Sequence, residues 1–282
     1  EFLLQHRERY DFGETSFEAT FESLVRDRFL SPAAWEQLEP SDCRLRVLQC
    51  MRVLMRDQKH RTRFVEMGAV EALVGLCVKL ADDHFQYPAA DFSSEMIVET
   101  LSILKRFAAL PELEPAAGTL ASTLALHRAL TTLLATRDAL VLQCVLVALY
   151  QFVQFDHHTL AIGQLGCAEM LLRIVGEYEP SFKVLAAELL DLLLSCRSFF
   201  QDVVLHHGVS VLLSLLHTDD AKLPVPLLRA IDTLVADAAC AKEVRKLGGI
   251  NVLLSVLVAH SSGDRRPQTP VVVAVCSVLT TL

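Results

Sequence analysis

Apolar residues recur along the chain with helical spacing, in short runs that break at small residues. The run at 199–217, FFQDVVLHHGVSVLLSLLH, contains an apolar-periodic helix, a break at Gly208 and a second periodic helix. Apolar positions three and four residues apart fall on one face of a helix, so each run predicts an amphipathic helix with one buried side. The same helix pair returns at other places in the chain.

The helix pair repeats at a nearly constant interval. Counted from the small residue at the junction, the markers are Gly68, Ala125, Gly166, Gly208 and Gly249, at intervals of 57, 41, 42 and 41 residues. A glycine can take the left-handed conformation that closes a helix. A period in the low forties with three helices per unit is typical of HEAT and armadillo solenoids.

After each marker, two further positions in the repeat carry leucine or isoleucine. Five residues after the marker the chain has Leu73, Leu130, Leu171, Leu213 and Leu254. Eight residues after it the chain has Leu76, Leu133, Ile174, Leu216 and Leu257. We expect both positions to be buried, because one three-helix unit cannot cover its own apolar stripe and neighbouring units must stack to do so.

These patterns predict an all-α fold, a right-handed armadillo-repeat solenoid of three-helix units. We expect an N-terminal strap and capping helices at 1–40, with an amphipathic helix at 17–30 and a short helix after Ser31 and Pro32. The predicted repeats span 41–259, with units near 58–109, 116–155, 157–197, 198–239 and a further unit from 240. A loop and a truncated final helix are expected at 260–282.

Within this plan, the Pro, Asp and Ser residues of 81–94 predict a loop inserted in the first full unit, where Phe85, Tyr87 and Phe92 are candidate contacts. The alternative is that these rings fold over the local core. The chain begins with Glu and stops inside an apparent helix. We therefore expect it to be a segment of a longer protein.

Composition supports a helical, soluble chain. Apolar residues make up 52% of it, with 11 glycines and 10 prolines, and this balance favours helices over hairpins. No run approaches the roughly 18 apolar residues that a membrane span needs, so no membrane partner is expected. A formal charge of −8 disfavours nucleic-acid binding, which needs clustered excess cations.

The eight cysteines lie in apolar segments without a CxxC pair. We expect buried, reduced thiols in a cytoplasmic protein. The histidine pairs at 157–158 and 206–207 lie too far apart in sequence to suggest the three or four converging ligands of a metal site. No metal and no cofactor are predicted.

The triplet DFG at 11–13 places a magnesium-binding Asp in protein kinases, but only beside a Gly-rich loop, a strand lysine and an HRD loop. None of these occurs in the 282 residues, so we interpret the triplet as a coincidence. Enzyme activity is not predicted for this segment.

The most basic stretch of this acidic chain runs from Arg52 to Arg63. Arg52 and Arg56 are one helical turn apart, and Lys59, Arg61 and Arg63 follow. One interpretation is a docking site for an acidic surface or tail. The alternative is a solvated helix face without a partner, which is the usual role of a surface charge run.

The segments GVSVLLSLL (208–216) and GINVLLSVL (249–257) resemble armadillo repeats more than HEAT repeats. In armadillo proteins that hold extended peptides, the resemblance implies a ladder of asparagines on the third helices, expected here at 94–109, 138–155, 180–196 and 221–237. The ladder position falls at Arg106, Gln151, Leu192 and Leu234.

None of these four residues is asparagine, so binding of extended cargo peptides is disfavoured. Leu192 and Leu234 would place apolar side chains on the floor of the concave groove, which suits an amphipathic helix or another chain. The candidate partner-binding residues are Arg106, Gln151, Leu192, Leu234, Arg52, Arg56, Arg61 and Arg63.

A narrower likeness runs from about residue 17 to 259. The segments at 17–31, 45–57, 178–194 and 208–223 resemble, in order and spacing, the armadillo region that precedes the kinase domain in the NIMA-related kinase family. Ser210, Pro224 and Pro226 depart from that pattern. The resemblance implies a parent Ser/Thr kinase of a family tied to cilia, centrosomes and microtubules.

Two functions follow as hypotheses. The first is a non-enzymatic scaffold or docking arm with axonemal or microtubule-associated protein partners, in the cytoplasm and at the cilium or axoneme. The second is a regulatory armadillo domain that acts in cis on a kinase domain elsewhere in the parent chain. Nucleic-acid binding is a third alternative, which the net charge disfavours.

Overall fold

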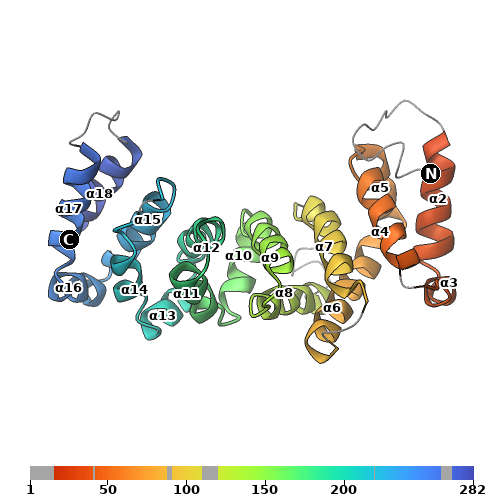
Figure 1. The fold of residues 1–282 in the computed structure, drawn as a ribbon, viewed down its shortest axis with the longest axis horizontal. Coiled ribbons are helices and arrows are strands. Elements are labelled where there is room, and N and C mark those ends of the chain that lie inside the picture. Colours follow the sequence, from red (N-terminus) through yellow and green to blue (C-terminus); the bar gives the residue numbers. More distant parts are fainter. Residues whose placement is uncertain (1–15, 41, 88–90, 110–119, 219, 262–268) are drawn as a thin grey trace. The chain divides into compact units, whose positions relative to one another are not determined.

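The computed structural model describes residues 16–40, 42–87, 91–109, 120–218, 220–261 and 269–282. Every regular element in these ranges is a helix (Figure 1). The chain forms two compact units, residues 1–152 and residues 153–282. Residues 1–15, which belong to the predicted N-terminal strap and contain the DFG triplet, and residues 262–268, where a loop was predicted before the final helix, lie outside the described residues.

The helices follow one another in threes through most of the predicted repeats, but in the repeat predicted at 116–155 the described residues hold two helices, at 120–133 and 139–152. The first unit contains α2 (Ser16–Leu24), the π-helix η1 (Val25–Phe29), α3 (Pro32–Glu36), α4 (Asp42–Leu54), α5 (Gln58–Glu66), α6 (Ala69–Gln86), α7 (Ser93–Leu104), the 3-10 turn η2 (Lys105–Phe107), α8 (Leu120–Leu133) and α9 (Ala139–Phe152). The second unit contains α10 (Asp156–Gly163), α11 (Ala168–Glu177), α12 (Pro180–Leu193), α13 (Arg197–Leu205), α14 (Gly208–Ser214), α15 (Pro224–Val235), α16 (Ala238–Lys246), α17 (Gly249–Ser261) and α18 (Thr269–Thr281).

The third helices of successive repeats stack on one another. In the first unit α7 packs against both α4 and α9, and in the second unit α15 packs against both α12 and α18 (Figure 1). Buried side chains such as Leu101 on α7 and Leu227 on α15 fill these contacts. Stacking buries an apolar face that no single repeat could cover, as an armadillo solenoid requires.

The N-terminal helices cover the first repeat through aromatic packing. Phe21 and Phe29 are buried, and Trp35 meets Phe29 edge-on with ring centroids 5.5 Å apart. Ser31 caps α3 by accepting a hydrogen bond from the backbone N–H of Ala34 at 3.4 Å, and Pro32 occupies the first helical position. The amphipathic helix and the capped short helix predicted here are confirmed.

The junctions between first and second helices use a left-handed residue, but not always the predicted marker. Gly68 (φ 68°) and Gly166 (φ 69°) are left-handed as expected, whereas the left-handed residues before α14 and α17 are His207 (φ 56°) and Gly248 (φ 73°). The markers Gly208 and Gly249 are instead the first residues of their helices. The marker at Ala125 was wrong as a junction, because Ala125 lies inside α8.

Gly208 is required for close packing rather than for its backbone angles. A Cβ atom at this position would lie 2.4 Å from Cγ1 and 2.8 Å from the carbonyl oxygen of Val203. The latter atom belongs to the backbone and cannot move away cheaply. The sequence pattern was therefore right that position 208 requires glycine. It was wrong that this residue turns the chain, because the left-handed residue is His207, one position earlier.

This one-residue slip explains an error in the predicted leucine stripe. Leu73, Leu130, Leu171 and Leu213 are buried as predicted, but Leu254 is 45% exposed, and Leu253 and Val256 are the buried residues of α17. Counted from the left-handed Gly248, position five is Leu253, so the register is restored. At the second stripe position Leu133, Ile174 and Leu216 are buried, whereas Leu76 and Leu257 are half-buried.

The predicted loop at 81–94 is largely helical. α6 continues to Gln86, so the longer first interval comes in part from a longer second helix. Residues 88–90 of the remaining connection lie outside the described residues. Phe85, Tyr87 and Phe92 are 44%, 61% and 40% exposed, so these rings do not fold into the core.

The cysteines and the length of the apolar helices were also predicted from the sequence. All eight cysteines are free; Cys77, Cys167, Cys196 and Cys240 are buried, but Cys276 is exposed, contrary to the expectation of burial. No single helix within the described ranges is both long and apolar enough to cross a membrane, and only α10 with α11, across a bend of 91°, pass that test as a pair.

The register at the His207 junction can be tested by substitution. We expect Gly208→Ala to lower the free energy of unfolding by about 1–3 kcal/mol, because the new methyl group overlaps the Val203 carbonyl. His207→Gly should raise it by about 1 kcal/mol, because glycine adopts the left-handed conformation without strain. Chemical denaturation measures both changes.

Gly176→Ala is the matched control for this experiment. Gly176 lies within α11 and an added Cβ would have no atom within 4 Å. Alanine should therefore stabilise that helix by up to about 1 kcal/mol. Equal stability of Gly208→Ala and the unaltered protein would contradict the close packing described above.

Candidate functional site

Four arginines of the first unit lie on or beside α4, α5 and α7. Arg52 lies on α4, Arg56 in the turn that follows it, Arg61 on α5 and Arg106 in η2. α7, which η2 continues, packs against α4, and the turn between α4 and α5 is fixed by Asp57, whose carboxylate accepts the backbone N–H of Lys59 at 2.9 Å. We call these four residues the arginine cluster.

Arg61 is held in place by uncharged acceptors. Its Nη1 donates to the carbonyl oxygens of Met55 and Arg56, both at 2.9 Å, and its Nη2 donates to Oε1 of Gln58 at 3.1 Å. The first two acceptors are carbonyls at the C-terminal end of α4, where a cation is favoured by the helix dipole. These bonds fix the guanidinium without placing a negative charge beside it.

Arg52 is positioned by a buried carboxylate. Its Nε lies 2.6 Å from Oε2 of Glu99, a residue of α7 that is 8% exposed. The two atoms are close, but their orientation does not meet hydrogen-bond geometry, so the contact is mainly ionic. Burial raises the pKa of Glu99, and the positive charge of Arg52 opposes that rise. Glu99 thus offsets part of the charge of the cluster.

Partial burial and neighbouring positive charges both lower the pKa of Arg106. Partial burial lowers it first, and the positive charges of Arg61, Arg56 and Arg52 lower it further. Arg61, Arg56 and Arg52 therefore each lie within electrostatic reach of Arg106. The cluster is therefore a place where positive charge gathers in an acidic chain, and it remains accessible, because Arg106 is exposed and the other three are half-buried.

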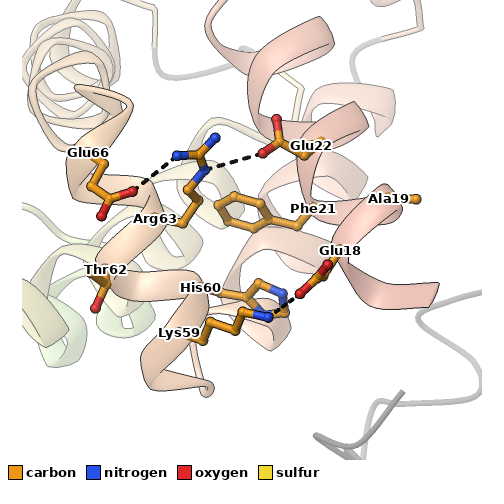
Figure 2. Close-up of a pocket in the computed structure, with 9 residues that line it drawn as sticks. All are labelled: Glu18, Ala19, Phe21, Glu22, Lys59, His60, Thr62, Arg63 and Glu66. Carbon is orange, nitrogen blue, oxygen red and sulfur yellow. Dashed lines mark hydrogen bonds and ion pairs between the residues drawn. The ribbon is translucent and has the colours of Figure 1, made fainter. Parts of the chain in front are cut away.

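Arg63 belongs to a different face of α5, although the sequence grouped it with the others. Its guanidinium lies between two carboxylates, 3.4 Å from Glu22 and 3.1 Å from Glu66, as Figure 2 shows. The pKa of Arg63 is raised by Glu66 and then by Glu22, opposite in direction to that of Arg106. On the same face Lys59 pairs with Glu18.

These pairs border a cavity of about 660 Å³ between α2 and α5. Its floor is formed by Phe21, which stacks on His60 with ring centroids 4.9 Å apart (Figure 2). A second cavity in the first unit, of about 470 Å³, is lined by Phe29, Trp35 and Met96 among others.

Of the four residues predicted at the ladder position of the third helices, some are exposed and one is buried. Gln151 and Arg106 are exposed, each followed by a buried phenylalanine, and Leu192 is half-buried. Leu234 was wrong as a contact residue, because it is fully buried, at 0% exposure. Its exposed neighbour Thr233 occupies the equivalent position.

The displacement at Leu234 has the same origin as that at Leu254. Counting from Gly208 instead of the left-handed His207 moved the ladder position by one residue into the core. The apolar floor predicted from Leu192 and Leu234 thus reduces to Leu192 alone. In contrast, four of the eight predicted contact residues, all arginines, come together in one cluster.

Glu99 was missed by the sequence analysis. The available signal was a glutamate in the middle of an apolar third helix, SSEMIVETLSIL at 93–104, where a carboxylate needs a cationic partner. The cation that pairs with the Glu99 carboxylate is determined by the packing of α4 against α7. The spacing of apolar residues along one helix does not reveal that packing.

No group of three or more potential ligands of the His, Cys, Asp and Glu types comes together in the part of the chain that the structure describes. His157 and His158 are adjacent rings with centroids 4.1 Å apart, and His158 is buried.

Comparison with known proteins supports the resemblance stated from the sequence. No protein-family model matches the chain. The human serine/threonine-protein kinase Nek10 is 32% identical over 195 residues, which is 69% of this chain and 16% of Nek10. Mouse Nek10 is 32% identical over 196 residues, 68% of this chain and 17% of the relative. The chain therefore spans about a sixth of the length of these relatives.

Solved structures share the fold. A computationally designed armadillo repeat protein for modular peptide recognition has a TM-score of 0.68 at 14% identity, covering 93% of this chain and 98% of the design. A designed armadillo repeat protein in complex with the peptide (KR)4 has a TM-score of 0.64 at 15% identity, covering 87% and 95%. A chain from a study of cadherin and beta-catenin has a TM-score of 0.69 at 17% identity, covering 94% of this chain and 46% of that one.

Proposed function

We propose that this armadillo-repeat segment, which resembles part of Nek10, is a non-enzymatic scaffold that binds protein partners through the arginine cluster. The observation that carries the proposal is the placement of Arg52, Arg56, Arg61 and Arg106 around the packed helices α4 and α7, with Arg61 fixed by uncharged acceptors. Positive charge gathered on an accessible surface attracts acidic chains and orients them. The partner is therefore an acidic protein segment.

The similar structures support this function at the level of the fold. One designed neighbour is described as a peptide binder, another was solved with the peptide (KR)4, and a third belongs to a study of the cadherin and beta-catenin interaction. The (KR)4 peptide is strongly basic, and the arginine cluster would repel it. The same fold would here be adapted to the opposite charge.

Binding of an acidic peptide tests the proposal. A glutamate-rich peptide should bind the unaltered segment with an affinity that falls as salt rises. Arg56→Glu combined with Arg106→Glu should weaken binding by about tenfold or more, because attraction becomes repulsion at both positions. Glu99→Gln should strengthen binding, since it removes the carboxylate that offsets Arg52. Fluorescence anisotropy at two salt concentrations measures all three.

Arg128→Glu is the matched control, because Arg128 is exposed on α8 of the same unit and lies outside the cluster. It alters the net charge by the same amount per substitution, so it should leave the affinity nearly unchanged. Equal losses in Arg128→Glu and the cluster variants would mean that net charge alone governs binding, and the cluster would not be the docking site.

A second candidate function is regulation of a kinase domain in cis, which the similarity to Nek10 favours. In a protein that carries both this segment and a kinase domain, the arginine cluster would hold an acidic part of the same chain. The Arg56→Glu and Arg106→Glu pair should then change the rate of peptide phosphorylation by the full-length protein and leave that of the isolated kinase domain alone. An unchanged rate in the full-length protein excludes this function.

We further propose that the scaffold acts in the cytoplasm on a ciliary, axonemal or other microtubule-based assembly. The support is the family expectation that accompanies the resemblance to NIMA-related kinases. Sedimentation with purified microtubules is the measurement: the segment should pellet with them, and the Arg56→Glu and Arg106→Glu pair should remain in solution. A segment that stays in solution at low salt would remove the microtubule part of the proposal.

A further inference from the structure

The helix α17, in the last described repeat, exposes an apolar face. Ile250 is 40% exposed, Leu254 45% and Val258 61%. Each lies four residues after the one before it, so the three side chains share one side of the helix. α18 packs beside α17 (Figure 1), and its Val273 is 61% exposed. Aliphatic side chains gathered at such exposure mark a surface that other protein covers.

In earlier repeats the same positions are buried. Counted from the left-handed residue of the repeat, Ile250 and Leu254 occupy positions two and six. The residues at these positions in three earlier repeats are at most 6% exposed: Val70 and Val74 on α6, Ala168 and Leu172 on α11, and Val209 and Leu213 on α14. Exposure of these two positions is therefore peculiar to α17 among the four repeats that share this junction.

The next repeat covers these positions in the earlier repeats. α6 packs against α8, α11 packs against α13 and α14, and α14 packs against α16. A Cβ atom added to Gly249, at the start of α17, would lie 3.3 Å from Cδ1 of Leu213, so the Leu213 side chain reaches the following second helix. Each repeat of a solenoid contacts its neighbours through the same surfaces. The exposed face of α17 continues the surface that joins the earlier repeats.

The third helix of this repeat shows the same difference. α15 and α18 bury residues at the same spacing: Leu227, Ile231 and Leu234 on α15, and Val271, Val275 and Val278 on α18. In this register Cys276 corresponds to Asp232, whose carboxylate accepts hydrogen bonds from Ser277 at 2.6 Å and Thr281 at 3.0 Å, both on α18. Side chains of the next third helix thus contact Asp232, whereas Cys276 is exposed.

The composition of α17 and α18 differs from that of a capping repeat, which turns a polar face to solvent and keeps a solenoid soluble. α17 (GINVLLSVLVAHS) and α18 (TPVVVAVCSVLTT) contain no Asp, Glu, Lys or Arg. The helices α2 and η1, which cover the first repeat, contain two glutamates, one aspartate and two arginines. α17 and α18 therefore have the composition of interior helices of a repeat array.

We propose that a further armadillo-type repeat of the parent protein covers this face, with its first and second helices on α17 and its third helix on α18. Two adjacent helices need cover, and in the earlier repeats a complete neighbouring repeat supplies it. A single bound peptide would leave one of the two helices exposed. The chain matches 16% of human Nek10, so in that relative most of the sequence lies outside the matched region.

Labelling of Cys276 with a maleimide in the full-length parent protein tests the inference. The thiol should react at least about tenfold more slowly there than in residues 1–282 alone, because a side chain under a packed helix reacts only when that helix opens. Leu254→Asp combined with Val258→Asp should restore the fast reaction, because docking would bury two unpaired carboxylates. Mass spectrometry of the labelled peptides measures the rates.

Leu205→Asp is the matched control. Leu205 is 72% exposed on α13 and lies outside this face, so the substitution should leave the labelling of Cys276 unchanged. Cys240, which is 1% exposed on α16, should stay unreactive in every variant and thereby show that the array is folded. Fast labelling of Cys276 in the full-length protein would overturn the inference. Slow labelling in residues 1–282 that becomes fast on dilution would also overturn it, because a second copy of the chain would then cover the face.

Discussion

In four repeats the residue that ends the first helix in the left-handed conformation sets the register of the helices that follow it. Gly68, Gly166, His207 and Gly248 take this conformation. Five residues later the chain places Leu73, Leu171, Leu212 and Leu253, all fully buried. A helix that started one residue later would rotate its side chains by about 100° and turn the stripe away from the core.

Because the third helices stack, residues far apart in sequence become neighbours on one surface. Arg106 is more than forty residues from Arg61, yet its charge interacts with Arg61, Arg56 and Arg52. α5 also separates two kinds of basic residue. Arg61 lies on one face and bonds to carbonyls at the end of α4. Arg63 lies on the other face and pairs with Glu66 of α5 and with Glu22 of α2. Separation of charge over one helix thus gives the unit a positive site within an acidic chain.

The sequence was sufficient to predict the fold class and the order of helices, because the period and the apolar spacing are direct consequences of stacked amphipathic helices. It could not fix the register in every repeat. Two glycines at 248–249 and a histidine before Gly208 offered two possible junction residues, and only backbone geometry distinguishes them. The errors at Leu234 and Leu254 both follow from that choice. The helical extension of α6 was missed because the aspartates at 82–83 are compatible with either a loop or an exposed helix face.

The site was predictable only in its parts. The sequence identified Arg52, Arg56, Arg61, Arg63 and Arg106 as candidates, but it could not tell which arginines have carboxylate partners. That property depends on Glu22, Glu66 and Glu99, which reach the arginines from the same helix and from two others. The balance of charge at a surface is a property of packing, and pattern along one helix does not reveal it.

The most direct test of the account observes the arginine side chains themselves. In a protein labelled with nitrogen-15, the Nε–H signals of Arg52, Arg56, Arg61 and Arg106 can be followed while an acidic peptide is added. The account predicts that these signals shift together and saturate, whereas that of Arg63 stays in place. Shifts confined to Arg63, or spread evenly over all surface arginines, would contradict a docking site at the arginine cluster.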